Sequence, residues 1–385
     1  MNSFKGLFKQ FERIFKQFPE AEEISKTVYK TTSSIYSDPS ILINFNEDKY
    51  RNLYKKWGEI GIFDHKSNYI NPLLYGLINY NIEKVDSGLR SAYSVQSSLV
   101  INPIEKFGTD FLKNKYLQDL YDGKKIGCFG LTEPNAGSDP ASMITTAKKH
   151  KDYYIVNGSK TWITNSPIAD LFVIWSKDEN NKIIGLVTER TNEIKTPYLH
   201  DKLSLLCSPT GQIFLDDLKI PEVNKLNVTR LKGPFNCLNK ARYGISWGVL
   251  GAMDNCIETS INYLSERKQF QKSLASNQII QNDIVKCVQL YNSSLNNSIS
   301  SLNLISDFKD LEENLGLISF LKKSNCENAI EIARITRDLL GGNGVSNSYN
   351  IMRHLINLEA VNTYEGTKNI HSLILGKYLF DKSAF

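Results

Sequence analysis

The spacing of apolar residues changes twice along the chain. Up to about residue 125, and again from about residue 235 to the end, apolar positions recur at helical spacing; Ile257, Ile261 and Leu264 form one stripe, and a second runs through 330–339. Several long helical segments with short connections predict an antiparallel bundle in the C-terminal part.

Between these regions the pattern is that of short strands. Runs at 153–156 and 160–163 flank Asn157-Gly158, a dipeptide that tolerates the positive φ angles of a tight turn, so we predict a strand, a turn and a second strand. Further strands are predicted at 171–175, 183–188 and 212–220. The whole order predicts an α+β multidomain protein, with an N-terminal α-helical domain at 1–125, a middle β domain at 126–232 and a C-terminal helical bundle at 233–385.

This order excludes the common nucleotide-binding folds. The chain lacks the strand–helix alternation of a doubly wound sheet, and no G-x-G-x-x-G opens a helix. The segment Gly158-Ser159-Lys160-Thr161 fails as a phosphate-binding P-loop because its lysine does not follow a glycine.

Composition narrows the class of protein further. The 385 residues suffice for two or three domains, and 41% hydrophobic and 23% charged residues are ordinary for a soluble globular chain. The net charge of +5 comes without a basic stripe or a nucleic-acid-binding motif, so we expect no nucleic-acid partner. This surplus suits an acidic small ligand such as a nucleotide or a CoA ester, although most such surpluses are only solvated surface.

The six cysteines form no C-x-x-C pair and the five histidines form no H-E-x-x-H motif, which predicts a reducing compartment and no metal site. No apolar run approaches the ~20 residues of a transmembrane helix.

In residues 1–18, phenylalanines recur at helical spacing with lysines between them. Two interpretations of this stretch remain open: part of a transit peptide or membrane-surface helix, or an amphipathic helix docked on its own protein.

Four segments carry side chains suited to ligand chemistry. The loop at 129–140 interleaves prolines and glycine with hydroxyl and amide groups, and 162–165 places an aromatic plane and a hydroxyl at a strand end. Residues 340–344 are Leu-Gly-Gly-Asn-Gly, and 362–367 set the Glu365 carboxylate beside Gly366, with Thr367 placed to cap the last helix. Each segment alone is equally compatible with an ordinary turn, core packing or a helix cap.

Together and in this order, the segments make the chain resemble the acyl-CoA dehydrogenase family, and within it the glutaryl-CoA dehydrogenases. The likeness runs from about residue 55 to the C-terminus, with 1–55 divergent. It is carried by 85–88, 90–92, 94–100, 127–140, 233–235, 241–245, 358–367 and 373–376. The resemblance implies an N-terminal helical domain, a middle β domain, a C-terminal four-helix bundle, FAD as cofactor and a homotetramer.

The resemblance also assigns roles to single residues. Glu365 matches the base that removes the α-proton of an acyl-CoA thioester. Tyr364 and Gly366 lie beside it on the substrate side, and the CoA segment maps to Phe235 through Arg242 and includes Asn239. The residues expected to bind FAD are Phe129, Leu131, Thr132, Gly137, Ser138 (shared with CoA), Trp162, Ile163, Thr164, Thr367 and Phe385. Elements expected to reach a neighbouring subunit's FAD are Arg267, Phe270, Gln278, Leu340, Gly341, Gly342, Asn343 and Gly344.

Arg90 decides the expected substrate. In the glutaryl subgroup an arginine here binds the second carboxylate of the substrate, with Ser91 beside it and a glutamate corresponding to Glu83 nearby. Burying a carboxylate without a cation is costly, and arginine offers a planar bidentate partner. The expected reaction converts glutaryl-CoA to glutaconyl-CoA and then, with loss of CO2, to crotonyl-CoA, as in lysine and tryptophan degradation. A lone arginine is more often a surface or domain-interface cation.

The sequence departs from the family pattern in the divergent first 55 residues and at three further places. The stretch 63–72 looks shortened, Leu206 replaces a usual arginine, and Gln271 replaces a usual glycine. Two rival hypotheses follow: a catalytically degenerate homologue that serves as a structural subunit, and a dehydrogenase of a short monocarboxylic or branched acyl-CoA. The family suggests an electron-transferring flavoprotein as acceptor, in the mitochondrial matrix of a eukaryote or the cytoplasm of a bacterium.

Overall fold

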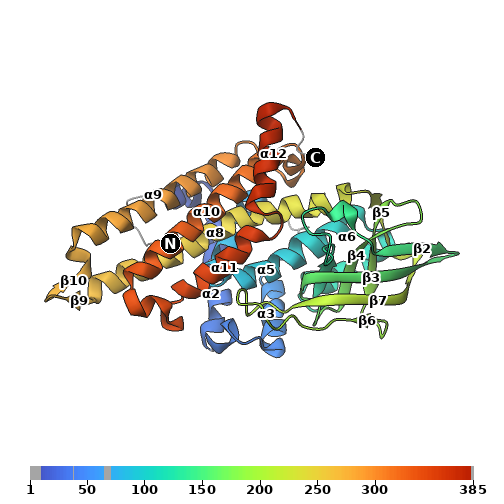
Figure 1. The fold of residues 1–385 in the computed structure, drawn as a ribbon, viewed down its shortest axis with the longest axis horizontal. Coiled ribbons are helices and arrows are strands. Elements are labelled where there is room, and N and C mark those ends of the chain that lie inside the picture. The colour runs from blue at the N-terminus through green and yellow to red at the C-terminus, as the bar shows by residue number, and fades with distance from the viewer. Residues whose placement is uncertain (1–9, 38, 65–70, 383–385) are drawn as a thin grey trace.

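The N-terminal part of the computed structural model, which describes residues 10–37, 39–64 and 71–382, is helical and centres on α4 (Pro72–Glu83) (Figure 1). Every residue of α4 is buried, because α2 (Pro19–Ser33) and α8 (Lys232–Glu266) both pack against it. A helix that is largely apolar on all sides needs such cover. The other elements of this part are α1 (Gln10–Gln17), α2 (Pro19–Ser33), α3 (Glu47–Glu59), α5 (Ser87–Ser94), the π-helical η3 (Val95–Ile101), α6 (Asn102–Phe107) and α7 (Asp110–Tyr121).

The described part of the amphipathic N-terminal stretch docks on the protein itself. Ile14 is buried, and the Phe11 ring centroid lies 5.4 Å from that of Tyr80 in α4. For α1 this supports the second of the two interpretations. Residues 1–9 lie outside the described residues, as do 65–70 within the stretch that looks shortened.

The middle part is an eight-stranded sheet in the order β6-β7-β3-β2-β4-β5-β8, with β1 parallel to β4. The strands predicted at 171–175, 183–188 and 212–220 are confirmed as β4, β5 and β7. The strands are β1 (Gly127–Gly130), β2 (Thr146–His150), β3 (Tyr153–Thr164), β4 (Leu171–Lys177), β5 (Ile183–Glu189), β6 (Ile194–Lys195), β7 (Thr210–Pro221) and β8 (Lys225–Thr229).

The tight turn predicted at Asn157-Gly158 is wrong. β3 continues through the dipeptide and pairs with β7 on both sides of it, with a register shift at this point. Gly158 has φ +147°, and a Cβ there would lie 2.5 Å from Thr145 Oγ1. Between the pairs Val156–Leu218 and Gly158–Leu215, β7 has two residues and β3 only Asn157, so the dipeptide lies opposite a β-bulge in β7. Pairing with β7 on both sides of the dipeptide prevents a chain reversal.

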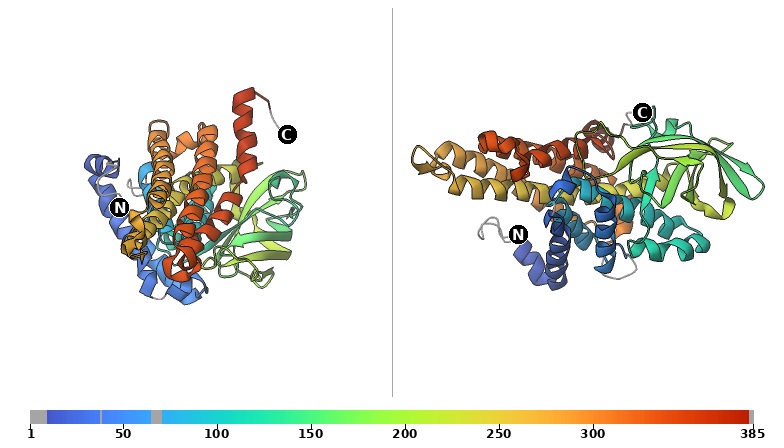
Figure 2. Two further views of the ribbon diagram at one scale, coloured as in Figure 1. Left: turned by 60° about the vertical axis from the view of Figure 1, so that its left-hand side comes forward. Right: turned by 90° about the horizontal axis from the view of Figure 1, so that it is seen from below.

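The C-terminal part is a bundle in which α10 packs against α8, α9, α11 and α12. With 35 residues, α8 spans about 50 Å, from the β domain to the small β9–β10 hairpin at the opposite end (Figures 1 and 2). The elements are α8 (Lys232–Glu266), β9 (Lys268–Gln269), β10 (Lys272–Ser273), α9 (Gln278–Ser301), α10 (Leu315–Leu339), α11 (Ile351–Thr363) and α12 (Lys368–Phe380).

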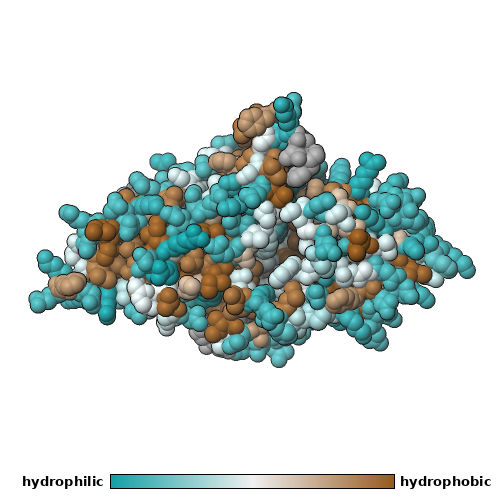
Figure 3. Space-filling view, in the orientation of Figure 1, coloured by the Kyte–Doolittle hydropathy of each residue, from teal (hydrophilic) through white to brown (hydrophobic). Residues whose placement is uncertain are grey.

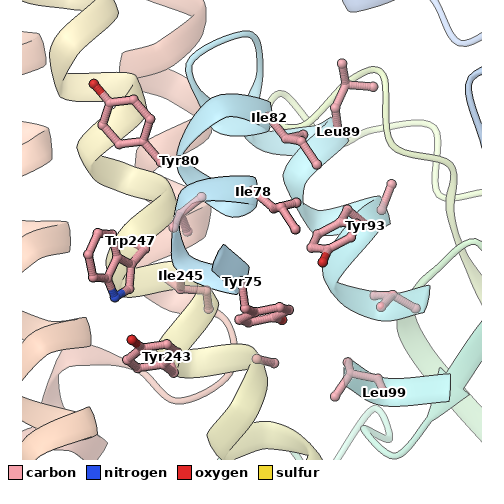
Figure 4. Packing of buried hydrophobic residues seen from close by; sticks show 14 of the residues in the cluster. Tyr75, Ile78, Tyr80, Ile82, Leu89, Tyr93, Leu99, Tyr243, Ile245 and Trp247 are labelled. Carbon is pink, nitrogen blue, oxygen red and sulfur yellow. The ribbon is translucent and has the colours of Figure 1, made fainter. Parts of the chain in front are cut away.

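The main core lies where α4, α5 and α8 meet (Figure 4). Tyr75, Tyr93 and Trp247 are fully buried there, and the first two rings lie 5.9 Å apart between centroids. Burying a large apolar side chain contributes about 1.5–3 kcal/mol, so this junction fixes α5 relative to α8. Outside the core, brown apolar surface gathers over the bundle, whereas the outer part of the β domain is mainly hydrophilic (Figure 3).

Candidate active site

Glu365 lies in a tight turn between α11 and α12. Glu365 has φ +54° and Gly366 has φ +100°, so two successive residues adopt left-handed conformations. A Cβ at position 366 would approach His371 Nε2 to 2.9 Å, which favours glycine there. A non-glycine residue in this conformation stores backbone strain, which is typical of functional positions. Thr367 then caps α12 by accepting a hydrogen bond from the backbone N–H of Ile370 at 3.3 Å.

Two basic side chains hold the backbone of this turn. Arg242 of α8 donates to the carbonyl oxygen of Glu365 at 2.8 Å. Lys322 of α10 donates to the carbonyl oxygens of Gly366 at 2.8 Å and Asn362 at 3.2 Å. The Glu365 carboxylate keeps its buried Oε2 without a hydrogen-bond partner in the described part of the chain, so the capacity of this atom to accept a hydrogen bond or a proton is unused.

The surroundings of Glu365 alter its acidity. Burial raises the pKa of its carboxyl group, and the charges of Arg90, Arg242 and Lys322 oppose this rise without cancelling it. A carboxylate with a raised pKa accepts a proton more readily than one in water. Glu365 therefore has the environment of a general base.

Arg90 and Glu83 form a buried ion pair next to this turn. The Arg90 Nε atom lies 2.7 Å from Glu83 Oε2, and both side chains are fully buried. Arg90 Nη2 donates to the hydroxyl of Tyr364, the residue before Glu365. Arg90 Nη1 and Glu83 Oε1 have no partner among the described residues. Ser91, the next residue of α5 after Arg90, is also buried.

Gly248 of α8 makes room for this ion pair, and sequence reasoning missed it. A Cβ at position 248 would lie 2.2 Å from Glu83 Oε2 and 2.8 Å from the Cδ atom of Arg90. Glycine lowers helix stability, so its presence at 244 and 248 within a long helical segment was the available signal of a close approach.

The residues expected to hold the flavin ring gather where β1 and β3 end. Trp162 has φ +59° and is 63% exposed, so its indole ring is open to a ligand. The backbone N–H of Thr161 donates to the carbonyl oxygen of Thr132 at 2.9 Å, which sets the loop after β1 against β3. Of the other expected residues, Phe129, Leu131 and Ile163 are buried, Thr164 is half-buried, and Gly137 and Ser138 are exposed.

A second buried ion pair, also missed, shapes this loop. Glu133 and Lys160 lie 2.8 Å apart with side chains at most 2% exposed, and Glu133 also accepts from the backbone N–H groups of Ile144 at 2.6 Å and Thr145 at 3.0 Å. Burial lowers the pKa of Lys160 to about 8 despite its partner. The signal in the sequence was strand alternation, which puts Lys160 on the inward face of β3 with Val156.

The expected CoA segment lies at the β-domain end of α8. Asn239 is buried and accepts from Arg242 Nη1 at 3.3 Å, whereas Phe235, one helical turn earlier, is 37% exposed. Asn239 and Arg242 are three residues apart and so share a helix face with access to the Glu365 turn.

The elements expected to serve a neighbouring subunit lie at the other end of the bundle. Arg267 and Phe270 flank β9, and Gln278 begins α9. Asn343 of the 340–344 segment, where Gly341 has φ +56°, donates to Tyr263 near the same end of α8 at 3.0 Å. About 50 Å of α8 separates this end from the β domain, so one chain does not bring these residues to Trp162 (Figure 1). Phe385 lies outside the described residues.

The two point departures lie away from the Glu365 turn. Gln271 lies at the exposed tip of the β9–β10 hairpin and has φ +62°. Glycine would adopt this left-handed conformation with less strain. Leu206 belongs to a β-domain loop whose neighbour Leu205 donates its backbone N–H to Asn357 of α11 at 2.6 Å. Among the described residues, no helix is long and apolar enough to span a membrane and no cluster of three metal-ligand side chains occurs.

The chain matches three family models: the acyl-CoA dehydrogenase N-terminal domain over 44–124, middle domain over 128–218 and C-terminal domain over 234–380. Glutaryl-CoA dehydrogenase from Mycobacterium smegmatis superposes with a TM-score of 0.88 at 36% identity, covering 95% of this chain and 96% of that chain. A glutaryl-CoA dehydrogenase structure from the same organism in complex with FADH2 gives a TM-score of 0.87 at 34% identity with the same coverage, 95% and 96%.

Two relatives with other names match at lower coverage. The 3-(aryl)acrylate reductase of Clostridium sporogenes is 30% identical over 305 residues, which are 76% of this chain and 79% of the relative. The caffeyl-CoA reductase-Etf complex subunit CarC of Acetobacterium woodii is 30% identical over 308 residues, 77% of this chain and 79% of the relative. With all three domain models matched in order and the fold shared over nearly the whole length, the chain belongs to the acyl-CoA dehydrogenase family.

Proposed function

We propose that this acyl-CoA dehydrogenase oxidises glutaryl-CoA at its Cα–Cβ bond and that the product loses CO2 to give crotonyl-CoA. The observation that carries the proposal is the fully buried Arg90, whose Nη1 has no partner among the described residues although Glu83 and Tyr364 accept from its other nitrogens. Leaving a buried donor unsatisfied is costly. A carboxylate at the end of the acyl chain satisfies it, and a monocarboxylic chain does not.

The spacing of the two functional groups favours a short acyl chain. The Tyr364 side chain contacts Arg90, and Glu365 is the next residue in the chain. The separation between the cation and the base is therefore about the length of one tyrosine side chain. Glu365 takes the α-proton, and the thioester carbonyl delocalises the electron pair left behind. After oxidation, the carboxylate on the γ-carbon leaves as CO2 because the resulting electron pair delocalises into the unsaturated thioester. Protonated Glu365 then returns its proton to the γ-carbon, which gives crotonyl-CoA.

The residues around Trp162 fit FAD, which when bound accepts the β-hydrogen of the substrate as a hydride. Trp162 offers an open aromatic plane, and Thr132 and Thr164 offer hydroxyl groups beside it. Thr367 is the N-cap of α12, and the free backbone N–H groups at this helix start favour a phosphate. Trp162, Thr132 and Thr164 would thus hold the ring, and the start of α12 would meet the phosphates.

Other copies of the chain complete this arrangement in the proposal. The bundle end that carries Arg267, Phe270, Gln278 and 340–344 serves the FAD of a neighbouring copy, because it lies too far from the β domain of its own chain. Phe270 is 97% exposed in the single chain, consistent with cover by another copy. The assembly is a homotetramer, and an electron-transferring flavoprotein accepts the electrons.

Anaerobic addition of glutaryl-CoA to the purified flavoprotein tests the function directly. We expect loss of the oxidised-flavin absorbance together with release of CO2, and much weaker reduction by butyryl-CoA at equal concentration. Equal reduction by both esters without CO2 would favour the monocarboxylic rival. A protein that purifies without flavin and cannot be reconstituted would favour the structural-subunit rival.

Arg90→Met is expected to weaken glutaryl-CoA selectively. Removing one partner of a buried charged pair costs about 2 kcal/mol or more, so kcat/KM for glutaryl-CoA falls at least about 30-fold. The loss with butyryl-CoA should be smaller because that chain carries no second carboxylate, and both esters are compared above the acidic limb of the pH profile because Arg90 also lowers the pKa of Glu365. Steady-state kinetics with both esters measure the ratio; equal losses would remove Arg90 from the substrate assignment. Arg334→Met, which removes an exposed guanidinium from α10, is the matched control.

A further inference from the structure

Lys322 is a buried cation with an unusual set of partners. Its side chain is fully buried in α10, yet the described residues place no carboxylate within ion-pair distance of its Nζ atom. Its hydrogen bonds go to the carbonyl oxygens of Gly366 at 2.8 Å and Asn362 at 3.2 Å. Burying an unpaired ammonium group is costly, so core packing alone does not account for this residue.

The two carbonyl groups that Lys322 binds lie on either side of Glu365. Asn362 belongs to the last turn of α11, and Gly366 follows Glu365 in the left-handed turn. Arg242 binds the carbonyl oxygen of Glu365 itself at 2.8 Å. Lys322 therefore bridges the start and the end of the strained segment, whereas Arg242 holds its middle.

We propose that Lys322 is a positioning residue for the base: it holds the turn that aims the Glu365 carboxylate and supplies a positive charge that keeps this carboxylate ionised. The inference rests on the proposed function of Glu365 as the base. Positioning matters because a displacement of about 1 Å at a reacting group can cost about 100-fold in rate.

The charged and titratable groups facing Glu365 come from several elements. Arg90 of α5, Arg242 of α8 and Lys322 of α10 each lower the pKa of the Glu365 carboxyl group, against the larger effect of burial. His371 of α12 is neutral, because burial, with Lys322 and Arg242 nearby, lowers its pKa to about 3. Glu83 of α4 is paired with Arg90. Burial lowers the pKa of two of these cations, Lys322 and Arg242. An arginine side chain nevertheless stays charged at any working pH.

The test is the pH dependence of flavin reduction by glutaryl-CoA in a rapid-mixing experiment on the FAD-loaded enzyme. Lys322→Met removes the charge and both hydrogen bonds. The limiting rate of flavin reduction near neutral pH is expected to fall about 10- to 100-fold. The acidic limb of the pH profile, where the rate falls as Glu365 becomes protonated, is expected to move to higher pH because the carboxylate loses a stabilising cation. Lys322→Arg, which keeps the charge, should keep the acidic limb close to its original position.

Lys323→Met is the matched control, because Lys323 is the next residue of α10 and forms only a partly exposed pair with Glu327. It should leave both rate and pH profile unchanged. An unshifted acidic limb in Lys322→Met overturns the proposal, as does the same shift in Lys323→Met.

If Lys322→Met loses FAD, Lys322→Gln takes its place in the same measurement; loss of FAD or folding in both would show a purely structural residue and overturn the proposal too. Failure of the wild-type enzyme to be reduced by any acyl-CoA would instead count against the proposed function.

Discussion

Glu365→Gln is expected to keep FAD and to lose reduction by acyl-CoA almost completely, with a rate about 10⁴-fold below that of the wild type. Glutamine has nearly the same size and can occupy the same turn, but its amide cannot accept the α-proton. The described residues around the turn offer no substitute, because burial lowers the pKa of His371 to about 3, which makes it a weak base, and Glu83 is already engaged by Arg90. Stopped-flow measurement of flavin reduction gives the rate.

The control for this variant is Glu359→Gln in the same helix, α11. Glu359 is about half exposed and pairs with Arg334 at the surface, so its replacement should leave the rate unchanged. The wild-type reaction should also slow as the pH falls through the pKa of Glu365, which burial raises, because the protonated carboxyl group is no base. A Glu365→Gln enzyme reduced at the wild-type rate would rule out Glu365 as the base.

Arg353→Met is expected to lower the free energy of unfolding by about 3–5 kcal/mol, because it leaves the Asp86 carboxylate buried without its cation. The Arg353 Nε atom lies 2.8 Å from Asp86 Oδ2, and both side chains are at most 8% exposed. Asp86 also accepts from Asn357 Nδ2 at 3.0 Å and from Cys207 Sγ at 3.1 Å. One carboxylate thus joins α11, a β-domain loop and the start of α5.

Urea denaturation of Arg353→Met, followed by far-UV circular dichroism, measures this loss. Arg334→Met removes the same group from an exposed pair and should cost at most about 1 kcal/mol. Activity should fall with stability, because α5 carries Arg90 and α11 leads directly to Glu365. A stability equal to that of the Arg334→Met control would show that the Asp86–Arg353 pair does not hold these elements together.

The prediction of secondary structure was most reliable where the signal was local. Helical periodicity in the two ends of the chain and short apolar runs of strand-forming residues at 171–175 and 183–188 both identified the correct element type. The error at Asn157-Gly158 has a clear cause: the dipeptide is compatible with a tight turn and also with a continuous strand opposite a β-bulge. Only the pairing of β3 with β7, some 55 residues further along the chain, distinguishes them.

The candidate site was predicted unevenly for a related reason. Glu365, Arg90 and Trp162 lie in recognisable motifs, so the sequence drew attention to each of them. Gly248 and Lys322 lie in ordinary helical segments, and their relevance appears only when α8 and α10 pack beside the ion pair and the Glu365 turn.

The sequence by itself determined which segments are helix or strand, the order of the three parts, and the motifs that identify the family, because these depend on residues close together in the chain. Only the tertiary structure decided that side chains of α5, α8 and α10 converge on the turn after α11, that one nitrogen of Arg90 has no partner in the described part of the chain and that burial raises the pKa of Glu365. Burial and charge act through space, so their effect on a side chain depends on which distant helices pack against it.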